Sequence, residues 1–295
     1  MRKGTTAQCR SRTVFARVTS AARTIAWTLF ATLPAGVCAA DTLPRVVSMN
    51  LCTDQLVLLL ADPDQILSLS RLAGDPRSSS MMAEAAAYPL NTGAAEEIFA
   101  LNPDVVLAGR YSDPTVLAML RRLGLRVEQI PITAALNEIP ELIRTVGAML
   151  QQDSRAERLA GEVAPRIAAY GTPSPDAPVA AFFYPNGYSL GADTLSHEIV
   201  SAAGFRNLSE ALGMTGGGRL ALEQLVAHAP DVLISAPRYP GHSRSEDLSF
   251  HPVLARYSDE GRLIFSTSDW VCGTPFSLRA VDTVATARAA LERDQ

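Results

Sequence analysis

Lysine is almost absent from this sequence, because Lys3 is the only lysine among 295 residues. Six of the 26 basic residues precede residue 41, whereas all 30 acidic residues follow residue 40, so the chain beyond residue 40 carries a net charge of −10. Charge repulsion therefore excludes nucleic acid and anionic membranes as partners. The same part of the chain also lacks an apolar run long enough for a membrane helix.

The first 40 residues have the pattern of an export signal. Basic residues without any acidic residue accompany an apolar run over residues 25–37, and the small residues Cys38 and Ala40 permit cleavage after residue 40. We expect residues 1–40 to be a signal peptide and the protein to be periplasmic. Lipid attachment at Cys38 is the alternative, but Val37 before it fits a lipidation site poorly.

Cysteine is scarce as well, since only Cys52 and Cys272 lie beyond the signal. Export makes a disulfide chemically possible, but the wide separation in sequence does not show whether the two residues meet. Three alternatives stay open: two unconnected small apolar residues, a bridge between two halves of the protein, or a thiol pair in contact with a ligand.

Two segments of the chain repeat one local plan. Residues 95–107 and residues 222–234 each contain a short amphipathic helix that opens near a glutamate, then a Pro-Asp pair, then an apolar strand. Two lobes with the same plan, separated by a long helical segment, predict a bilobed receptor that closes on a ligand.

Strands and helices alternate on both sides of a strand-free segment, and this alternation favours parallel sheets. We predict an α/β fold with an N-terminal lobe over residues 41–136 and a C-terminal lobe over residues 176–295. The apolar spacing of residues 137–175 predicts one long α-helix and a connector between the lobes. Pro165 should kink or end that helix near Ala164. Both lobes are expected to be Rossmann-like, with mostly parallel sheets.

Four segments in this order and spacing carry a resemblance to a known family. They are Val46–Leu60, the Glu96 helix with Asn102-Pro103-Asp104, the helix Thr194–Ala203 with the following Gly204-Phe205-Arg206-Asn207-Leu208, and Thr267-Ser268-Asp269-Trp270. Together they resemble the periplasmic binding proteins for cobalamin and iron chelates that feed ABC importers, the class with a rigid helical backbone. The resemblance covers about residues 44–293.

The resemblance implies capture of a small-molecule metal chelate between the lobes, either a ferric siderophore or a corrinoid or heme-like ligand. It also implies a monomer without its own cofactor that delivers the chelate to the permease and ATPase of an ABC importer. In the family, one glutamate on each lobe docks into arginine pockets of the permease, and Glu96 and Glu223 fall on those positions. Two separated carboxylates would give such a complex a two-point register. The alternative is that both are ordinary solvated glutamates at helix starts.

The cleft residues follow from strand ends, because ligands of such folds bind at the carboxyl ends of the strands. The predicted ligand-binding residues are Arg71, Arg110, Tyr111, Tyr184, Tyr188, Arg219 and Trp270. Aromatic rings stack on flat chelates, and guanidinium groups pair with anionic or amide oxygens. Aromatic residues make up only 6% of the chain, and the arginines favour an anionic iron chelate over a corrinoid or heme.

A secreted serine hydrolase is the alternative function. Residues 187–191 match the G-x-S-x-G pattern around Ser189, and Asp231 or Asp247 followed by His251 would complete the required chain order. The pattern needs a strand that runs directly into a helix, and here the next predicted helix begins several residues later. We therefore expect a binding protein and not an enzyme. The four histidines lack metal-ligand spacing, so no protein metal site is predicted. A structural or adhesive protein is a third alternative.

Overall fold

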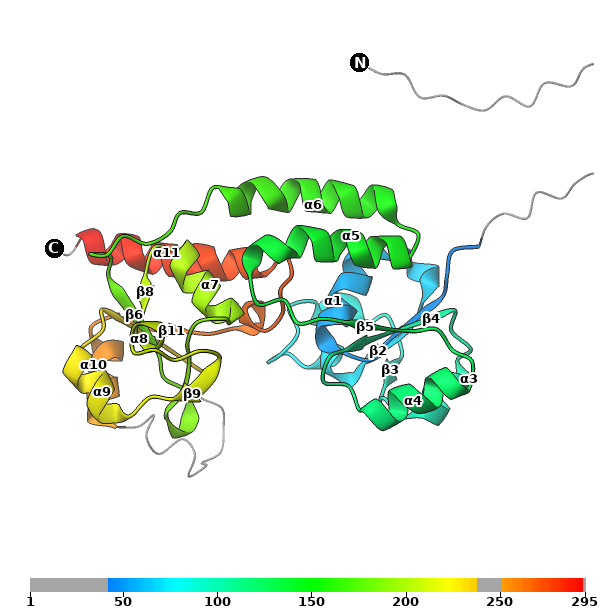
Figure 1. The fold of residues 1–295 in the computed structure, drawn as a ribbon, viewed down its shortest axis with the longest axis horizontal. Coiled ribbons are helices and arrows are strands. Elements are labelled where there is room, and N and C mark those ends of the chain that lie inside the picture. Colours follow the sequence, from blue (N-terminus) through cyan, green and yellow to red (C-terminus); the bar gives the residue numbers. More distant parts are fainter. Residues whose placement is uncertain (1–41, 238–250, 294–295) are drawn as a thin grey trace, which may run out of the picture. The chain divides into compact units, whose positions relative to one another are not determined.

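The computed structural model describes residues 42–237 and 251–293 (Figure 1). The predicted signal peptide over residues 1–40 and the candidate residue Asp247 lie outside the described residues. Residues from Thr42 onward belong to one compact unit. No helix among the described residues is both long enough and apolar enough to cross a membrane.

The first lobe contains a five-stranded sheet in the order β3-β2-β1-β4-β5, and every strand pair is parallel. Its strands are β1 (Val46–Ser48), β2 (Ile66–Ser70), β3 (Leu90–Asn91), β4 (Val105–Gly109) and β5 (Val127–Ile130), and its helices are α1 (Leu51–Leu60), α2 (Met82–Ala85), α3 (Ala95–Ala100) and α4 (Pro114–Arg122). All residues of β1 and β4 are buried, as expected for central parallel strands covered on both faces. The parallel sheet predicted for this lobe is confirmed.

The second lobe contains a parallel four-stranded sheet in the order β11-β10-β6-β8 and a separate antiparallel pair of β7 with β9. The strands are β6 (Val179–Phe182), β7 (Tyr188–Leu190), β8 (Arg206–Asn207), β9 (Gly217–Arg219), β10 (Val232–Ser235) and β11 (Leu263–Phe265). The helices are α7 (Leu195–Ala202), α8 (Leu208–Ala211), α9 (Leu222–His228), α10 (Pro252–Asp259) and α11 (Ser277–Arg293). Phe182, Phe183 and Phe205 are fully buried in this lobe.

The near-repeat in the sequence is a structural repeat, with α3 and β4 in one lobe and α9 and β10 in the other (Figure 1). The aspartate before each strand is held in the same way. The Asp104 carboxylate accepts the backbone N–H of Arg45 at 2.7 Å, and the Asp231 carboxylate accepts that of Val179 at 2.7 Å. Each aspartate thereby ties its helix–strand unit to the neighbouring strand, β1 or β6.

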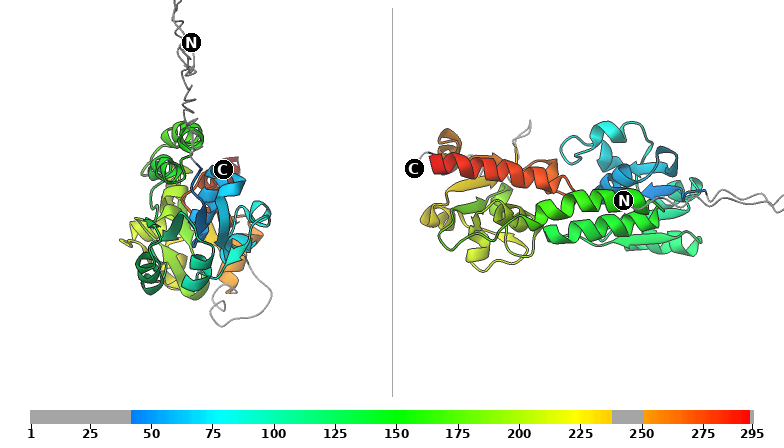
Figure 2. Two further views of the ribbon diagram at one scale, coloured as in Figure 1. Left: turned by 90° about the vertical axis from the view of Figure 1, so that its right-hand side faces the viewer. Right: turned by 90° about the horizontal axis from the view of Figure 1, so that it is seen from above.

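The prediction of one long linker helix is wrong. The segment instead folds into two helices, α5 (Ile139–Met149) and α6 (Asp153–Ala168), which lie side by side (Figures 1 and 2). Gln151 has a left-handed backbone (φ 56°). The N–H of Gln152 donates to the carbonyl of Gly147 at 2.8 Å, and the N–H of Gln151 donates to that of Ala148 at 3.2 Å. These two bonds form a Schellman motif, which ends α5.

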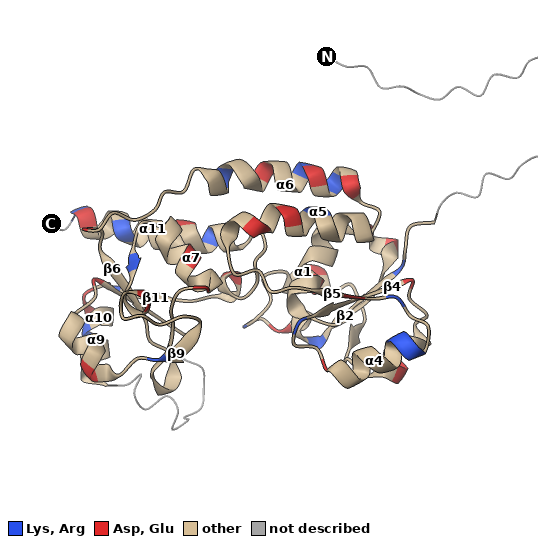
Figure 3. Ribbon diagram, viewed as in Figure 1, with Lys and Arg blue, Asp and Glu red and all other residues tan. Residues whose placement is uncertain are grey.

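An ion pair also joins the two helices of this hairpin, and acidic and basic residues alternate along α6 (Figure 3). The guanidinium of Arg144 on α5 donates to the Glu157 carboxylate on α6 at 2.7 Å. Pro165 does not end α6, which continues to Ala168. A proline leaves the carbonyl four residues earlier without its helical donor. That carbonyl belongs to Gly161, which is exposed to solvent, so water can satisfy it.

Gly147 marks the closest approach of the two linker helices. A Cβ atom there would lie 2.2 Å from the Cβ of Ala156. We expect Gly147→Ala to lower the free energy of unfolding by about 1–3 kcal/mol through overpacking. This cost exceeds the gain of about 1 kcal/mol in helix propensity.

Gly161 on α6 provides the matched control, because nothing lies within 4 Å of a Cβ atom built there. Gly161→Ala should therefore raise the free energy of unfolding by roughly 0.5–1 kcal/mol. Urea denaturation of the two variants measures both changes. Two changes of the same sign would contradict the close packing of α5 on α6.

Candidate functional site

The candidate site lies at the carboxyl ends of β1 and β4. The strand order of the first sheet reverses between these two strands, and open α/β sheets bind ligands at such a point. A cavity of about 240 Å³ opens there, and its lining includes Asn50, Cys52, Arg110 and Tyr111. Val271 from the second lobe also lines it. The structure therefore brings three of the predicted site residues together.

Neighbouring side chains hold the backbone of the loop that carries Arg110 and Tyr111. A Cβ atom at Gly109 would lie 2.7 Å from the Asn50 side-chain nitrogen, so a larger residue there would have to displace the Asn50 side chain. The Gly109 N–H donates to the Ser112 hydroxyl at 3.1 Å. The Gln129 side-chain amide donates to the carbonyls of Gly109 and Arg110, each at 3.3 Å. The two candidate side chains thus project from an ordered backbone.

The rim of the cavity is apolar and open to solvent. Tyr111, Ile132 and Val271 all line it, with exposed fractions of 86%, 51% and 52%. Exposed apolar side chains that gather at a cavity indicate a surface that a ligand or partner covers. The guanidinium of Arg110, which is also exposed, supplies charge at the same rim.

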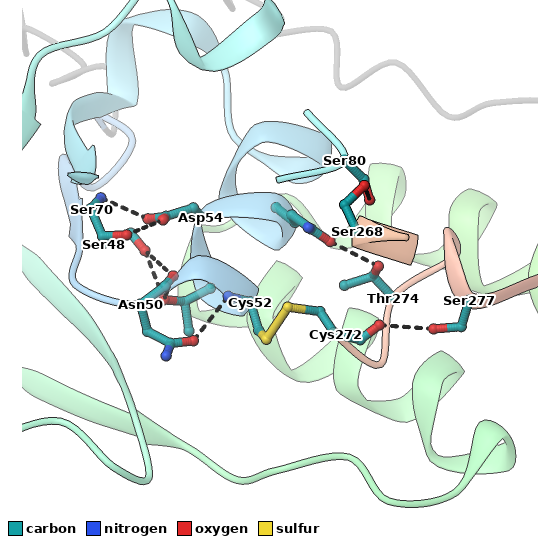
Figure 4. The surroundings of a disulfide bond; sticks show 12 residues. Ser48, Asn50, Cys52, Asp54, Ser70, Ser80, Ser268, Cys272, Thr274 and Ser277 are labelled. Atoms are coloured by element: carbon teal, nitrogen blue, oxygen red, sulfur yellow. Dashed lines mark hydrogen bonds between the residues drawn. A yellow bond between two sulfur atoms is a disulfide. The ribbon is translucent and has the colours of Figure 1, made fainter. Parts of the chain in front are cut away.

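A disulfide between Cys52 and Cys272 joins the two lobes beside this cavity (Figure 4). Of the three alternatives for these cysteines, the structure contains the bridge. Cys52 also lines the cavity, so the bridge forms part of its wall. Gly273, the next residue, lies so close to the first lobe that a Cβ atom would be 2.4 Å from the Thr133 Cβ.

Hydrogen bonds between the lobes reinforce the disulfide. The Thr274 hydroxyl donates to the buried Gln55 side-chain oxygen at 3.0 Å. The Ser80 hydroxyl donates to the carboxylate of Asp269 at 2.8 Å and lies 3.0 Å from the hydroxyl of Ser268. The lobes are therefore connected both through the α5–α6 hairpin and through this second set of contacts.

Trp270 and Tyr184, two of the predicted ligand-binding residues, lie against the core of the second lobe. Trp270 is only 7% exposed, and its ring meets that of Phe182 edge-on, with centroids 6.1 Å apart. Tyr184 stacks on the ring of Phe182, with centroids 6.2 Å apart, and burial raises the pKa of its phenol. Neither residue is among those that line the cavity. Their roles in ligand binding stay predictions.

The other predicted cleft residues lie outside the cavity. Tyr188 and Arg219 face each other in register across the β7–β9 pair. Arg71 lines a neighbouring depression of about 110 Å³ at the ends of β2 and β3, together with Asn91, and this depression shares Asn50 with the cavity. The structure does not bring these three to the cavity that holds Arg110 and Tyr111, and their ligand contacts also stay predictions.

Several residues of the site were missed from the sequence. Asn50 and Ile132 lie just beyond the ends of β1 and β5, so the rule of strand ends could have found both. Val271 and Gly273 reach the cavity because the disulfide holds their segment against the first lobe. No sequence signal locates that contact.

Asp54 is a buried carboxylate in the first turns of α1. Its carboxylate accepts the backbone N–H of Ser70 at 3.0 Å and the Ser70 hydroxyl at 2.5 Å. Burial raises the pKa of Asp54 to about 6, although hydrogen bonds from Ser48 and Ser70 oppose the shift. This group connects α1, whose cap Asn50 lines the cavity, to the end of β2.

Glu96 and Glu223 occupy the same position, the second residue of α3 and of α9, and both are exposed. The side chain of the next residue in each helix accepts a backbone N–H from a residue that precedes the helix. The Glu97 carboxylate accepts the N–H of Thr92 at 2.8 Å, and the Gln224 side chain accepts that of Ala221 at 3.3 Å. Among the residues described, the carboxylates of Glu96 and Glu223 make no hydrogen bond or ion pair.

Ser189 is fully buried in the middle of β7. Its hydroxyl donates to the Phe182 carbonyl at 2.6 Å and lies 2.7 Å from the Ser209 hydroxyl. Asp231 is engaged with Val179, and the His251 ring caps α10. The described residues therefore do not assemble the strand–serine–helix turn of a hydrolase. Within residues 42–237 and 251–293, no three histidines, cysteines or carboxylates are grouped to hold a metal ion.

Known proteins resemble this chain both in sequence and in fold. The sequence profile of a family described as periplasmic binding protein matches residues 46–256. A cobalamin-binding protein of Halobacterium salinarum is 26% identical over 197 residues, which cover 65% of this chain and 53% of the relative. The chain thus spans about half the length of the curated relatives it matches.

Solved structures share the fold. A periplasmic heme-binding protein from Roseiflexus sp. RS-1, in apo form, aligns with a TM-score of 0.67 and 22% identity over 84% of this chain and 100% of its own. A periplasmic heme-binding protein from Pseudomonas aeruginosa aligns with a TM-score of 0.65 and 25% identity over 84% of this chain and 92% of its own. The predicted two-lobed α/β fold is thereby confirmed.

Proposed function

This chain belongs to the family of periplasmic binding proteins, and on that premise we propose that it captures a metal-bearing tetrapyrrole, a corrinoid or a heme. The ligand would bind at the carboxyl ends of β1 and β4 and bring its own metal, without a resident cofactor. Residues 1–40 would direct export to the periplasm, where the protein, as a monomer, would deliver the ligand to the permease and ATPase of an ABC importer.

The observation that carries the choice of ligand is the apolar rim formed by Tyr111, Ile132 and Val271. A flat macrocycle has an apolar face that such a rim can cover, and an aromatic ring stacks on it. Arg110 can pair with the carboxylates or amides at the edge of the macrocycle. A ferric siderophore presents mainly polar and charged surface, which this rim suits less well. The names of the relatives, which bind cobalamin or heme, point in the same direction.

The size of the cavity limits how the ligand can lie. Pockets that enclose drug-sized ligands measure about 300–1,000 Å³, and this cavity is smaller, at about 240 Å³. A tetrapyrrole would therefore insert one edge and leave the rest above the rim. Tyr188 and Arg219 of the second lobe remain candidates for contact with that outer part.

Direct titration tests the choice of ligand. The protein without residues 1–40 is titrated with hemin, cyanocobalamin, cobinamide and a ferric catecholate siderophore, followed by absorbance and by tryptophan emission. Trp270 is the only tryptophan beyond the signal, so the emission reports on one position. We expect micromolar or tighter binding of a tetrapyrrole, and tighter binding of the siderophore would overturn the proposal.

The rim residues should account for much of the affinity. We expect Tyr111→Ala and Arg110→Ala each to weaken tetrapyrrole binding about tenfold, a loss usual when a side chain that contacts the ligand is truncated. Arg122→Ala, which removes an exposed arginine on α4, is the matched control and should bind like the wild type. Equal affinities for all four proteins would place the ligand elsewhere.

Delivery would use Glu96 and Glu223. Each lobe presents a carboxylate at the same helix position, without a partner among the described residues. Arginines of a permease could form charge-assisted bonds to both and so fix the register of the complex. Because neither glutamate lines the cavity, docking and ligand binding can be tested separately.

A further inference from the structure

We infer that each docking glutamate acts together with an apolar neighbour, Phe99 on the first lobe and Val226 on the second. The partner surface would be a permease that presents an apolar recess beside each of two arginines. The inference rests on the proposed delivery function and adds two residues to its docking surface.

Phe99 and Val226 are exposed although both are large and apolar, with exposed fractions of 46% and 51%. Single exposed apolar residues are common and need no explanation. These two, however, occupy the same position, the fifth residue of α3 and of α9. In both helices the residue just before them, Ile98 or Leu225, is fully buried. Each helix thus buries one apolar residue, Ile98 or Leu225, in the core and exposes the apolar residue that follows it.

The apolar residue and the glutamate lie on one side of each helix. Phe99 follows Glu96 by three positions, and Val226 follows Glu223 by three positions. Residues three apart on a helix are neighbours, with Cβ atoms about 5–6 Å apart. A partner that binds one member of a pair therefore also meets the other.

The backbone that carries the two pairs is fixed before any partner arrives. The backbone after each helix turns through a left-handed residue, Asn102 with φ 47° and Ala229 with φ 39°. Left-handed geometry costs an alanine roughly 1–2 kcal/mol, so this turn is imposed by the surrounding fold. The following aspartates, Asp104 and Asp231, tie each unit to its sheet. Preorganised groups lose little entropy on binding.

The repetition indicates the chemistry of the partner. A surface that offers a carboxylate and an apolar side chain twice, in the same local geometry, fits a partner that offers an arginine and an apolar recess twice. Two copies of one membrane subunit, or two closely similar subunits, have this property. Since phenylalanine fills more space than valine, the first lobe should contribute more to the affinity.

The experiment measures association of the ligand-free protein with the permease–ATPase complex of the organism that encodes this chain, reconstituted in lipid nanodiscs. We expect Phe99→Ala to weaken association about tenfold and Val226→Ala about threefold, with the double variant weaker still. Glu96→Ala/Glu223→Ala is measured in parallel. Leu212→Ala is the matched control, because Leu212 is another exposed apolar residue but lies outside both helices. Melting temperature and tetrapyrrole affinity should not change in any variant.

The outcomes separate the two proposals. Weakening by both the glutamate pair and the apolar pair, but not by Leu212→Ala, supports the inference. Weakening by the glutamate pair alone overturns the inference and leaves the proposed delivery function in place. Equal weakening by Leu212→Ala would mean a general apolar effect and would also overturn it. A wild-type protein that does not associate with the complex would overturn the delivery function itself.

Discussion

Replacement of Cys52 and Cys272 by serine is expected to lower the free energy of unfolding by about 4–5 kcal/mol. The disulfide closes a loop of 220 residues, and a closed loop of that length removes a large part of the chain entropy of the unfolded state. For a protein of this size the loss corresponds to roughly 10–20 °C in melting temperature. Calorimetry and urea denaturation of the protein without residues 1–40 measure both quantities.

Chemical reduction of the disulfide in the wild type provides the control. Dithiothreitol should destabilise the wild type to the level of the double variant and leave the double variant unchanged. Thiol titration of the unfolded, unreduced wild type should find no free thiol, because Cys52 and Cys272 are its only cysteines beyond the signal. Two free thiols, or a stability that does not respond to reduction, would contradict a bridge that staples the lobes.

The lobes themselves could be predicted because their signals are local. Buried parallel strands are short apolar runs between turn residues, and β4 and β10 stand out in that way. The linker could not be predicted correctly, since helical spacing continues across the break between α5 and α6. The break has a Schellman motif with Gln151 in the left-handed position, where glycine would have given a sequence signal.

In the candidate site, too, features set by nearby residues could be predicted, whereas contacts between distant segments could not. The position of Arg110 and Tyr111 at the cavity could be predicted because both follow β4 directly. Trp270 also follows a strand, but the intervening 3₁₀ turn over Ser268–Trp270 returns the ring to the core beside Phe182. The pairing of Cys52 with Cys272 depends on how two lobes meet, and nothing in the residues near either cysteine encodes that contact.

Ionisation of the buried Asp54 carboxyl is by itself expected to lower the free energy of unfolding by about 3 kcal/mol as the pH rises from about 3 to 7. Burial raises the pKa of its carboxyl from 3.8 to about 6 in the folded state. Between those values the folded protein holds a proton that the unfolded chain has released, so stability falls as pH rises. The stabilising contribution is fully present below about pH 3.8 and is lost above about pH 6.

Other carboxylates act in the opposite direction and must be separated from Asp54. Hydrogen bonds to backbone N–H groups lower the pKa of Asp104 and of Asp113. Stability from such groups is present above their unfolded pKa and is lost as pH falls. The total pH curve therefore contains opposing contributions, and only the difference between a variant and the wild type isolates one residue.

Asp54→Asn makes that difference measurable. The amide oxygen can still accept the Ser70 N–H, and the Ser70 hydroxyl can turn to accept from the amide nitrogen. Denaturant titrations at a series of pH values should show the variant gaining about 3 kcal/mol relative to the wild type between about pH 3 and pH 7. Asp113→Asn, at the exposed cap of α4, should give a difference of opposite sign. A flat difference curve for Asp54→Asn would mean that this buried carboxyl ionises as readily in the folded protein as in the unfolded chain, and that its hydrogen bonds fully offset its burial.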